Sequence, residues 1–168
     1  MVRVTAGDVD AAAFAPFGWL PVDDTDPTDG THTLTYELGD PHCNVIGHGY
    51  DEVDHTPAGA VCARMYRHDT HTQVLMPLNV DAVVAVAPAG VDFSDPAHVD
   101  SVRAFHLRPL DVVVLHQGTW HWGPFPLGPE PVRLLNVQAR GYQADNADVD
   151  LPGAAGAVVE VVLEVVAE

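Results

Sequence analysis

The 168-residue chain contains no lysine, and its seven basic residues are all arginines, set against 24 acidic residues. The formal net charge of −17 predicts a surface that repels phosphate backbones and anionic lipids. The sequence therefore argues against nucleic acid or a membrane as a partner. A small anionic substrate would need a local cluster of arginine or histidine that works against this field.

Cysteine is scarce, and long apolar runs are absent. Cys43 and Cys62 form neither a disulfide framework nor a CxxC metal knuckle. No apolar run reaches the ~18 residues that a membrane span needs, and the N-terminus lacks the pattern of a signal peptide. These absences predict a cytoplasmic protein with reduced thiols.

Several motifs of well-defined chemistry are also missing. The sequence has no GxSxG nucleophile elbow, no P-loop, no GxGxxG fingerprint and no HExxH pair. Acyl-enzyme hydrolysis, nucleotide triphosphate chemistry and dinucleotide redox chemistry therefore have no support.

The patterns that are present favour many short strands. Glycine and proline number 14 each, which is typical of short elements with frequent turns. Period-two alternation and short apolar runs predict strands at 31–38, 60–68, 73–78, 82–87, 111–115, 132–138 and 158–166. Short helices are expected at 7–14 and after the Ser94-Asp95-Pro96 cap. Residues 1–168 are thus predicted to form one all-β domain, a sandwich or barrel.

Two polar clusters follow hydrophobic strands, at 66–73 (YRHDTHTQ) and 116–122 (HQGTWHW). Small barrels place ligand sites at strand ends, and imidazole suits both proton transfer and metal ligation. The candidate functional histidines are therefore His68, His116 and His121. The other seven histidines, His71 on its turn among them, are interpreted as surface or core groups. Trp120 is open to two interpretations, pocket wall or core.

Strand periodicity predicts the direction in which the side chains of the first cluster point. Side chains repeat with period two, so Arg64, Tyr66 and His68 are expected to point into one space. We expect His68 and His121 to face a pocket together with Gln73, with His116 as a third histidine.

In order and spacing, these pieces resemble the ureidoglycolate lyases, a cupin family of allantoin catabolism. The resemblance runs over residues ~11–150 and rests on 13–18 (AFAPFG), Arg67-His68, Gln73, Pro77, 83–87 (VVAVA), 102–105 (VRAF), Leu115-His116, Trp120-His121 and Arg140. It implies a cupin-type antiparallel β-barrel or jelly roll. It also implies a lyase reaction, the elimination of urea from ureidoglycolate to give glyoxylate.

That reaction needs a base, an acid and a cation for the carboxylate. The resemblance implies that His68, His116 and His121 handle protons. It implies that Arg67 or Arg140 grips the carboxylate and that Gln73 orients the amide, because a guanidinium binds a carboxylate bidentately. Tyr66 and Trp120 complete the expected substrate-binding set.

The same resemblance does not decide whether the site binds a metal ion. Cupins often bind a divalent metal through a His-x-His-x4-Glu motif and a later histidine. Here Tyr66-x-His68-x4-Gln73 takes the place of the first motif, and His121 takes that of the later histidine. The expected ligand set for a divalent metal ion is therefore His68, Gln73 and His121.

Four departures from the family pattern keep rival functions open. They are Tyr66, Gln117, Trp122 and Ala139, all in or beside the expected site. They favour a metal-dependent cupin isomerase, lyase or oxygenase acting on a different small acid or sugar acid. A non-catalytic cupin that binds a small molecule is the third candidate. A homodimer is expected, because cupins pair through sheet edges and 158–166 would be a hazard as an open edge.

Overall fold

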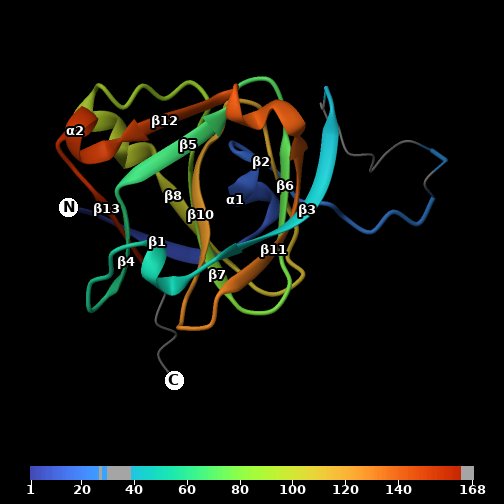
Figure 1. Cartoon of the computed structure of the whole chain (residues 1–168), viewed down its shortest axis with the longest axis horizontal. Coiled ribbons are helices and arrows are strands. Elements are labelled where there is room, and N and C mark those ends of the chain that lie inside the picture. The colour runs from blue at the N-terminus through green and yellow to red at the C-terminus, as the bar shows by residue number, and fades with distance from the viewer. Residues whose placement is uncertain (27, 30–38, 164–168) are drawn as a thin grey trace.

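The structure, a computed structural model, describes residues 1–26, 28, 29 and 39–163. In this part of the chain, two curled β-sheets are joined by short helices and turns (Figure 1). The all-β fold expected from the sequence is confirmed. The strand expected at 31–38 and the end of the one expected at 158–166 lie outside the described residues. Among the described residues, no helix is long and apolar enough to cross a membrane.

The larger sheet has eight strands. Their order across the sheet is β12 (Asn146–Asp150), β5 (Arg64–His68), β10 (Trp120–Pro126), β7 (Ala82–Ala87), β8 (Arg103–Leu107), β1 (Val2–Asp8), β13 (Val159–Leu163) and β4 (Gly59–Cys62). Most pairs are antiparallel, but β1 runs parallel to both β13 and β8.

The smaller sheet has five strands, in the order β2 (Gly18–Trp19), β9 (Val113–Leu115), β6 (Gln73–Pro77), β11 (Val132–Ala139) and β3 (Pro41–His48). The helical elements are α1 (Ala11–Phe14), α2 (Leu151–Ala155) and the 3₁₀ helices η1 (Tyr50–Glu52), η2 (Pro96–Ser101) and η3 (Arg140–Gln143).

The N-terminal segment differs from the expected helix at 7–14. Its first part, up to Asp8, belongs to β1, and the helix begins only at Ala11. The reason is the cap: the Asp10 carboxylate accepts hydrogen bonds from the backbone N–H groups of Ala12 and Ala13, which fixes the helix start.

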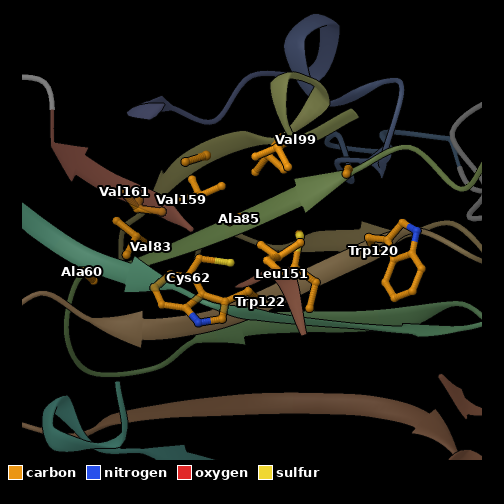
Figure 2. Packing of buried hydrophobic residues seen from close by; sticks show 14 of the residues in the cluster. Ala60, Cys62, Val83, Ala85, Val99, Trp120, Trp122, Leu151, Val159 and Val161 are labelled. Carbon is orange, nitrogen blue, oxygen red and sulfur yellow. The ribbon is translucent and has the colours of Figure 1, made fainter. Parts of the chain in front are cut away.

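Strand β7 separates two cores, which explains why its sequence is apolar without alternation. All six of its residues are buried. Val83 and Ala85 belong to a cluster inside the curl of the larger sheet, where Cys62, Trp122 and Leu151 lie close together (Figure 2). Residues on the other face of β7 pack between the two sheets; they are Val84 and Val86, against Phe14, Phe105 and Leu115.

The two sheets meet where β5 passes into β6. His68 ends β5 and Gln73 begins β6, so the four-residue turn between them links one sheet to the other. The backbone N–H of Gly118 donates to the His68 carbonyl at 2.7 Å, which ties the turn before β10 to the same place. Gly118 has φ of +75°, a conformation that glycine adopts without strain. Both polar clusters of the sequence are thereby brought to one junction.

Candidate functional site

Three imidazoles gather at this junction. The His68 ring stacks on His71 with centroids 4.6 Å apart and lies 5.4 Å from His121. His68 and His121 come from the neighbouring strands β5 and β10, and His71 comes from the turn after β5. All three residues are buried, with exposed fractions of 7%, 2% and 8% for His68, His71 and His121. His71, interpreted from the sequence as a turn residue without function, is thus part of the cluster.

Burial keeps these imidazoles uncharged. Burial, together with repulsion from the neighbouring His121 and His71, lowers the pKa of His68 to about 3. Burial also lowers the pKa of His121 to about 4. The pKa of His71 is lowered by burial as well, although Asp145 opposes the shift. At neutral pH the cluster therefore offers neutral nitrogen atoms.

A carboxylate also belongs to the cluster. It comes from a segment for which the sequence analysis predicted no functional residue. An oxygen of Asp145, between η3 and β12, lies 3.2 Å from His71 Nδ1. The Thr70 hydroxyl and backbone N–H donate to Asp145 at 2.6 and 2.9 Å. Burial raises the pKa of Asp145, but the hydrogen bonds from Thr70 outweigh it and leave the pKa below its usual value. Asp145 is therefore ionised. Its position in the sequence did not indicate a functional role, because most acidic residues of this chain lie in polar turns.

Gln73 faces the cluster at the start of a buried chain of amides. Its Nε2 donates to Asn136 at 2.8 Å, and Asn136 donates in turn to Asn44 at 2.9 Å. The Oε1 atom of Gln73 is buried and has no hydrogen-bond partner. The two asparagines therefore fix the amide so that a free acceptor remains beside the histidines.

The pocket at the cluster is narrow. It has an empty volume of about 150 Å³ and no room for a water-sized sphere between its walls; its lining residues are His68, His71, Gln73, Leu115, His116, Thr119 and His121. His116 is exposed and stands at the rim. The structure thus brings His68, His121, Gln73 and His116 around one pocket, as expected, but leaves no space there for an organic molecule without movement.

Tyr66 and Arg64 do not share this pocket, which corrects the expectation that they point into one space with His68. Tyr66 pairs with His121 across the strands, but it is 37% exposed. Both residues line a separate hollow with an empty volume of about 1060 Å³, whose wall also contains Trp122. Arg64, Tyr66 and His68 alternate along β5 as the period of two requires. They nevertheless line two different hollows, His68 one and the other two residues the second.

Arg67 and Trp120 lie on the opposite face of β5 and β10. The Arg67 guanidinium carbon is 4.6 Å from the centre of the Trp120 ring, and Arg67 Nε lies 3.1 Å from an oxygen of Asp69. Trp120 Nε1 donates to the Val91 carbonyl at 3.0 Å within the core of the larger sheet. The structure therefore places neither residue at the histidine pocket. Trp120 belongs to the core cluster, and it also lines a separate surface hollow together with Arg67.

Arg140 lies at the surface, where its Nε is 3.4 Å from Asp40. All seven arginines belong to the described part of the chain, and none of them lines the histidine pocket. The cation expected for a substrate carboxylate is therefore not supplied there by an arginine of this chain.

The residues present fit a divalent metal ion, and the group that fits includes His68 from the expected ligands. His68, His71 and Asp145 each offer one ligand atom, and these atoms lie within 4.8 Å of one another. Nδ1 of His68 and both ring nitrogens of His71 are buried without a hydrogen-bond partner. Among the expected ligands His68, Gln73 and His121, only His68 belongs to this group. Imidazole and carboxylate together suit first-row transition metals.

The sequence profile of the ureidoglycolate lyase family matches residues 1–153. The chain belongs to this family. The resemblance identified from the motifs is thereby confirmed. A search of curated proteins finds no match for the chain.

Solved structures similar to the chain include oxalate decarboxylases. A mutant of the Bacillus subtilis enzyme matches with 17% identity and a TM-score of 0.37, over 60% of this chain and 30% of that one. The Lactobacillus farciminis enzyme in a formate complex matches with 16% identity and a TM-score of 0.37, over 61% and 34%. The chain thus spans about a third of the length of these proteins, and the likeness says nothing of the reaction.

Proposed function

We propose that this member of the ureidoglycolate lyase family eliminates urea from ureidoglycolate to give glyoxylate, with the histidine pocket as its catalytic centre. The observation that carries the proposal is the group of three buried, uncharged imidazoles beside the free Oε1 acceptor of Gln73. Membership of the family supports the type of reaction.

The reaction moves one proton and breaks one bond. A base removes the proton of the carbinol hydroxyl, the C–O bond becomes the aldehyde, the C–N bond breaks, and the urea nitrogen receives a proton. A neutral imidazole accepts the first proton. Because the pKa values of His68 and His121 are low, the imidazolium that forms is a strong acid and passes the proton on to the leaving nitrogen.

Substrate recognition follows from the atoms left free. Gln73 Oε1 accepts a hydrogen bond from an N–H of the ureido group, and the amide chain through Asn136 holds it in that orientation. Because the bottom of the pocket is narrow, the substrate lies toward the rim, where His116 is exposed. His116 is thereby proposed to contact the substrate rather than to belong to the buried cluster.

A second candidate function is a metal-dependent cupin reaction on a different small acid. The grouping of His68, His71 and Asp145 favours it. A divalent ion held by these residues would supply a positive charge for the carboxylate of an acid substrate.

The domain organisation, location, substrate type and oligomeric state of the protein are also proposals. We propose one cupin-like domain, a cytoplasmic location and a small anionic substrate. A homodimer is also proposed, although its original reason no longer applies. Strand β13 is paired on one side with β1 and on the other with β4, so in the described residues it is not an open edge.

The test is urea release from ureidoglycolate by the purified chain, followed together with glyoxylate formation. We expect equal amounts of the two products. Replacing His68 by Gln should lower kcat/KM by about 10²-fold, the scale of a general acid–base contribution. His98→Gln, at an exposed histidine of η2, is the matched control and should leave kcat/KM unchanged. Absence of urea release above the uncatalysed rate at millimolar substrate would contradict the proposal.

A further inference from the structure

We propose that His68, His71 and Asp145 form a divalent transition-metal site whose carboxylate ligand comes from the segment between η3 and β12. This ligand set differs from the one expected from the cupin motif, in which Gln73 and His121 would bind with His68. The inference concerns binding alone, so it does not depend on which reaction the pocket performs.

The distances are close to those of a ligated ion. Metal–nitrogen and metal–oxygen bonds of about 2.0–2.2 Å place two ligand atoms at most about 4.4 Å apart. The three ligand atoms here lie within 4.8 Å of one another, so small side-chain rotations bring them onto one ion. Each comes from a different backbone element: the end of β5, the turn after it, and the segment before β12.

The contact between His71 and Asp145 brings two ligand atoms together. His71 Nδ1 and the Asp145 oxygen are 3.2 Å apart, in the geometry of an ion pair, and the other ring nitrogen, Nε2, is buried without a hydrogen-bond partner. His71 is 2% exposed, so water does not solvate these atoms. An unpaired buried polar group lowers the stability of the folded chain, and ligation of a cation would remove that cost.

Asp145 is also held as a ligand carboxylate is commonly held. The Thr70 hydroxyl and backbone N–H and the Asp69 backbone N–H all donate to it, at 2.6, 2.9 and 3.2 Å. Such outer contacts fix the orientation of a metal ligand and tune the affinity of the site.

Space and charge both favour an ion at this position. Two of the three proposed ligands, His68 and His71, line the narrow pocket, and a cation bound directly to its ligands needs little space there. No arginine lines the pocket, so a cation there would supply the positive charge that an anionic substrate requires in a chain of net charge −17. Two imidazoles and one carboxylate favour Mn²⁺, Fe²⁺, Co²⁺, Ni²⁺ or Zn²⁺ over Ca²⁺ and Mg²⁺, which prefer oxygen ligands.

The experiment measures binding without activity. The full chain is stripped with a chelator and titrated with Co²⁺, and both the visible absorption of the bound ion and the heat of binding are recorded. We expect one equivalent to bind, with absorption bands typical of nitrogen and oxygen ligands. The melting temperature should rise with Co²⁺ concentration, because the ion binds only the folded chain.

Variants identify the ligands. His71→Ala and Asp145→Ala should each lower the affinity at least 10–100-fold, the loss that follows removal of even an outer contact. Their matched controls are His98→Ala and Asp148→Ala, an exposed histidine and an exposed acid of β12, which should bind Co²⁺ as the wild type does. Thr70→Val is a milder variant that keeps the ligands and should still weaken binding.

Two results would overturn the inference. One is the absence of stoichiometric Co²⁺ binding by the folded wild-type chain. The other is binding that survives His71→Ala and Asp145→Ala but is lost in Gln73→Ala and His121→Ala, because that would assign the ion to the set expected from the cupin motif. Urea release without any bound metal would overturn neither the lyase proposal nor the binding result, so the two proposals fail separately.

Discussion

The two faces of the β5–β10 pair use neighbouring residues for opposite purposes. On one face, His68 and His121 meet in a narrow pocket with polar atoms that have no partner. On the other face, Arg67 covers Trp120, whose indole N–H is hydrogen-bonded within an apolar core. Successive strand residues point to opposite sides, so a continuous motif divides between the proposed catalytic pocket and a structural contact.

The two faces are also expected to contribute differently, the core face to stability and the pocket face to the proposed reaction. On the core face, Trp120 Nε1 is hydrogen-bonded while Arg67 Nε has no hydrogen-bond partner, and loss of the packing there should appear as lost stability. The pocket face contains buried nitrogen and oxygen atoms without partners, which lower stability in the absence of a ligand. Variants on the core face should therefore change mainly the free energy of unfolding, whereas variants on the pocket face should change mainly turnover.

The largest effect is expected on the core face. Trp120→Ala should lower the free energy of unfolding by about 3–5 kcal/mol, because it opens a cavity beside Phe93 and removes the surface under Arg67. Urea denaturation measures the change. Trp120→Phe keeps most of the volume and should lose less, with unchanged turnover per folded molecule. Lost turnover in folded Trp120→Phe would show that the core face takes part in the reaction.

On the pocket face, acid should destabilise the protein through its histidines. The pKa of His121 is about 4 in the folded chain and about 6.5 in an unfolded one, so between these values the unfolded state binds a proton that the folded state refuses. Stability is therefore complete above about pH 6.5 and falls as the pH decreases toward 4. One pKa unit corresponds to about 1.4 kcal/mol, so the difference between 6.5 and about 4 gives a loss on the order of 3 kcal/mol from His121 alone.

The measurement is urea denaturation at pH 7, 6, 5 and 4 in the presence of a chelator. His121→Gln should show a shallower loss of stability than the wild type over this range, because it removes one titrating group. His98→Gln should follow the wild type. Parallel profiles for His121→Gln and the wild type would contradict the low pKa of His121.

The buried amide chain gives an intermediate effect. Asn136→Leu removes the partner of Gln73 Nε2 and should cost about 1–3 kcal/mol of stability, because a buried donor is left unpaired. It should also raise KM more than it lowers kcat, since the amide then loses its fixed orientation. Asn44→Ala, at the outer end of the chain, should have a smaller effect on both quantities. Equal effects of the two variants on KM would argue against a positioning role for Asn136.

The smallest effect is expected for the guanidinium above the indole. Arg67→Met keeps an apolar stem over Trp120 but removes the charge, and should lower stability by about 0.5–1 kcal/mol, the value of a partly exposed cation–π contact. A shift in melting temperature measures it, with Arg133→Met, at an exposed arginine of β11, as the control. A loss several times larger would indicate that Arg67 supports more than this contact.

The sequence predicted the fold well because alternation and turn residues are local signals. Gln73, 82–87 and 132–138 lie on strands as expected, and the family motifs brought His68, His116 and His121 to one pocket. Strand β1 was missed because no element was expected before residue 7, and Gly7 and Asp8 were included in the helix expected at 7–14. Only the position of the cap decides where that helix begins.

The composition of the site was harder to predict, because it depends on contacts between distant segments. Asp145 meets His71 from 74 residues away, and no spacing rule indicates such a contact. Arg67 was assigned to the substrate from its place in a motif, although its strand face, which the period of two determines, points away from His68. The spacing of His68 and His71 across a turn was the one local signal that would have added a residue to the site.

The most direct test of the central claim compares one variant from each face in the same assay. Rates of urea release from ureidoglycolate are measured for His121→Gln and Arg67→Met, each normalised to the folded fraction. The account predicts that His121→Gln loses about 10²-fold in kcat/KM, whereas Arg67→Met stays within about twofold of the wild type. A large loss for Arg67→Met with near-normal rates for His121→Gln would contradict it, because the reaction would then belong to the opposite face.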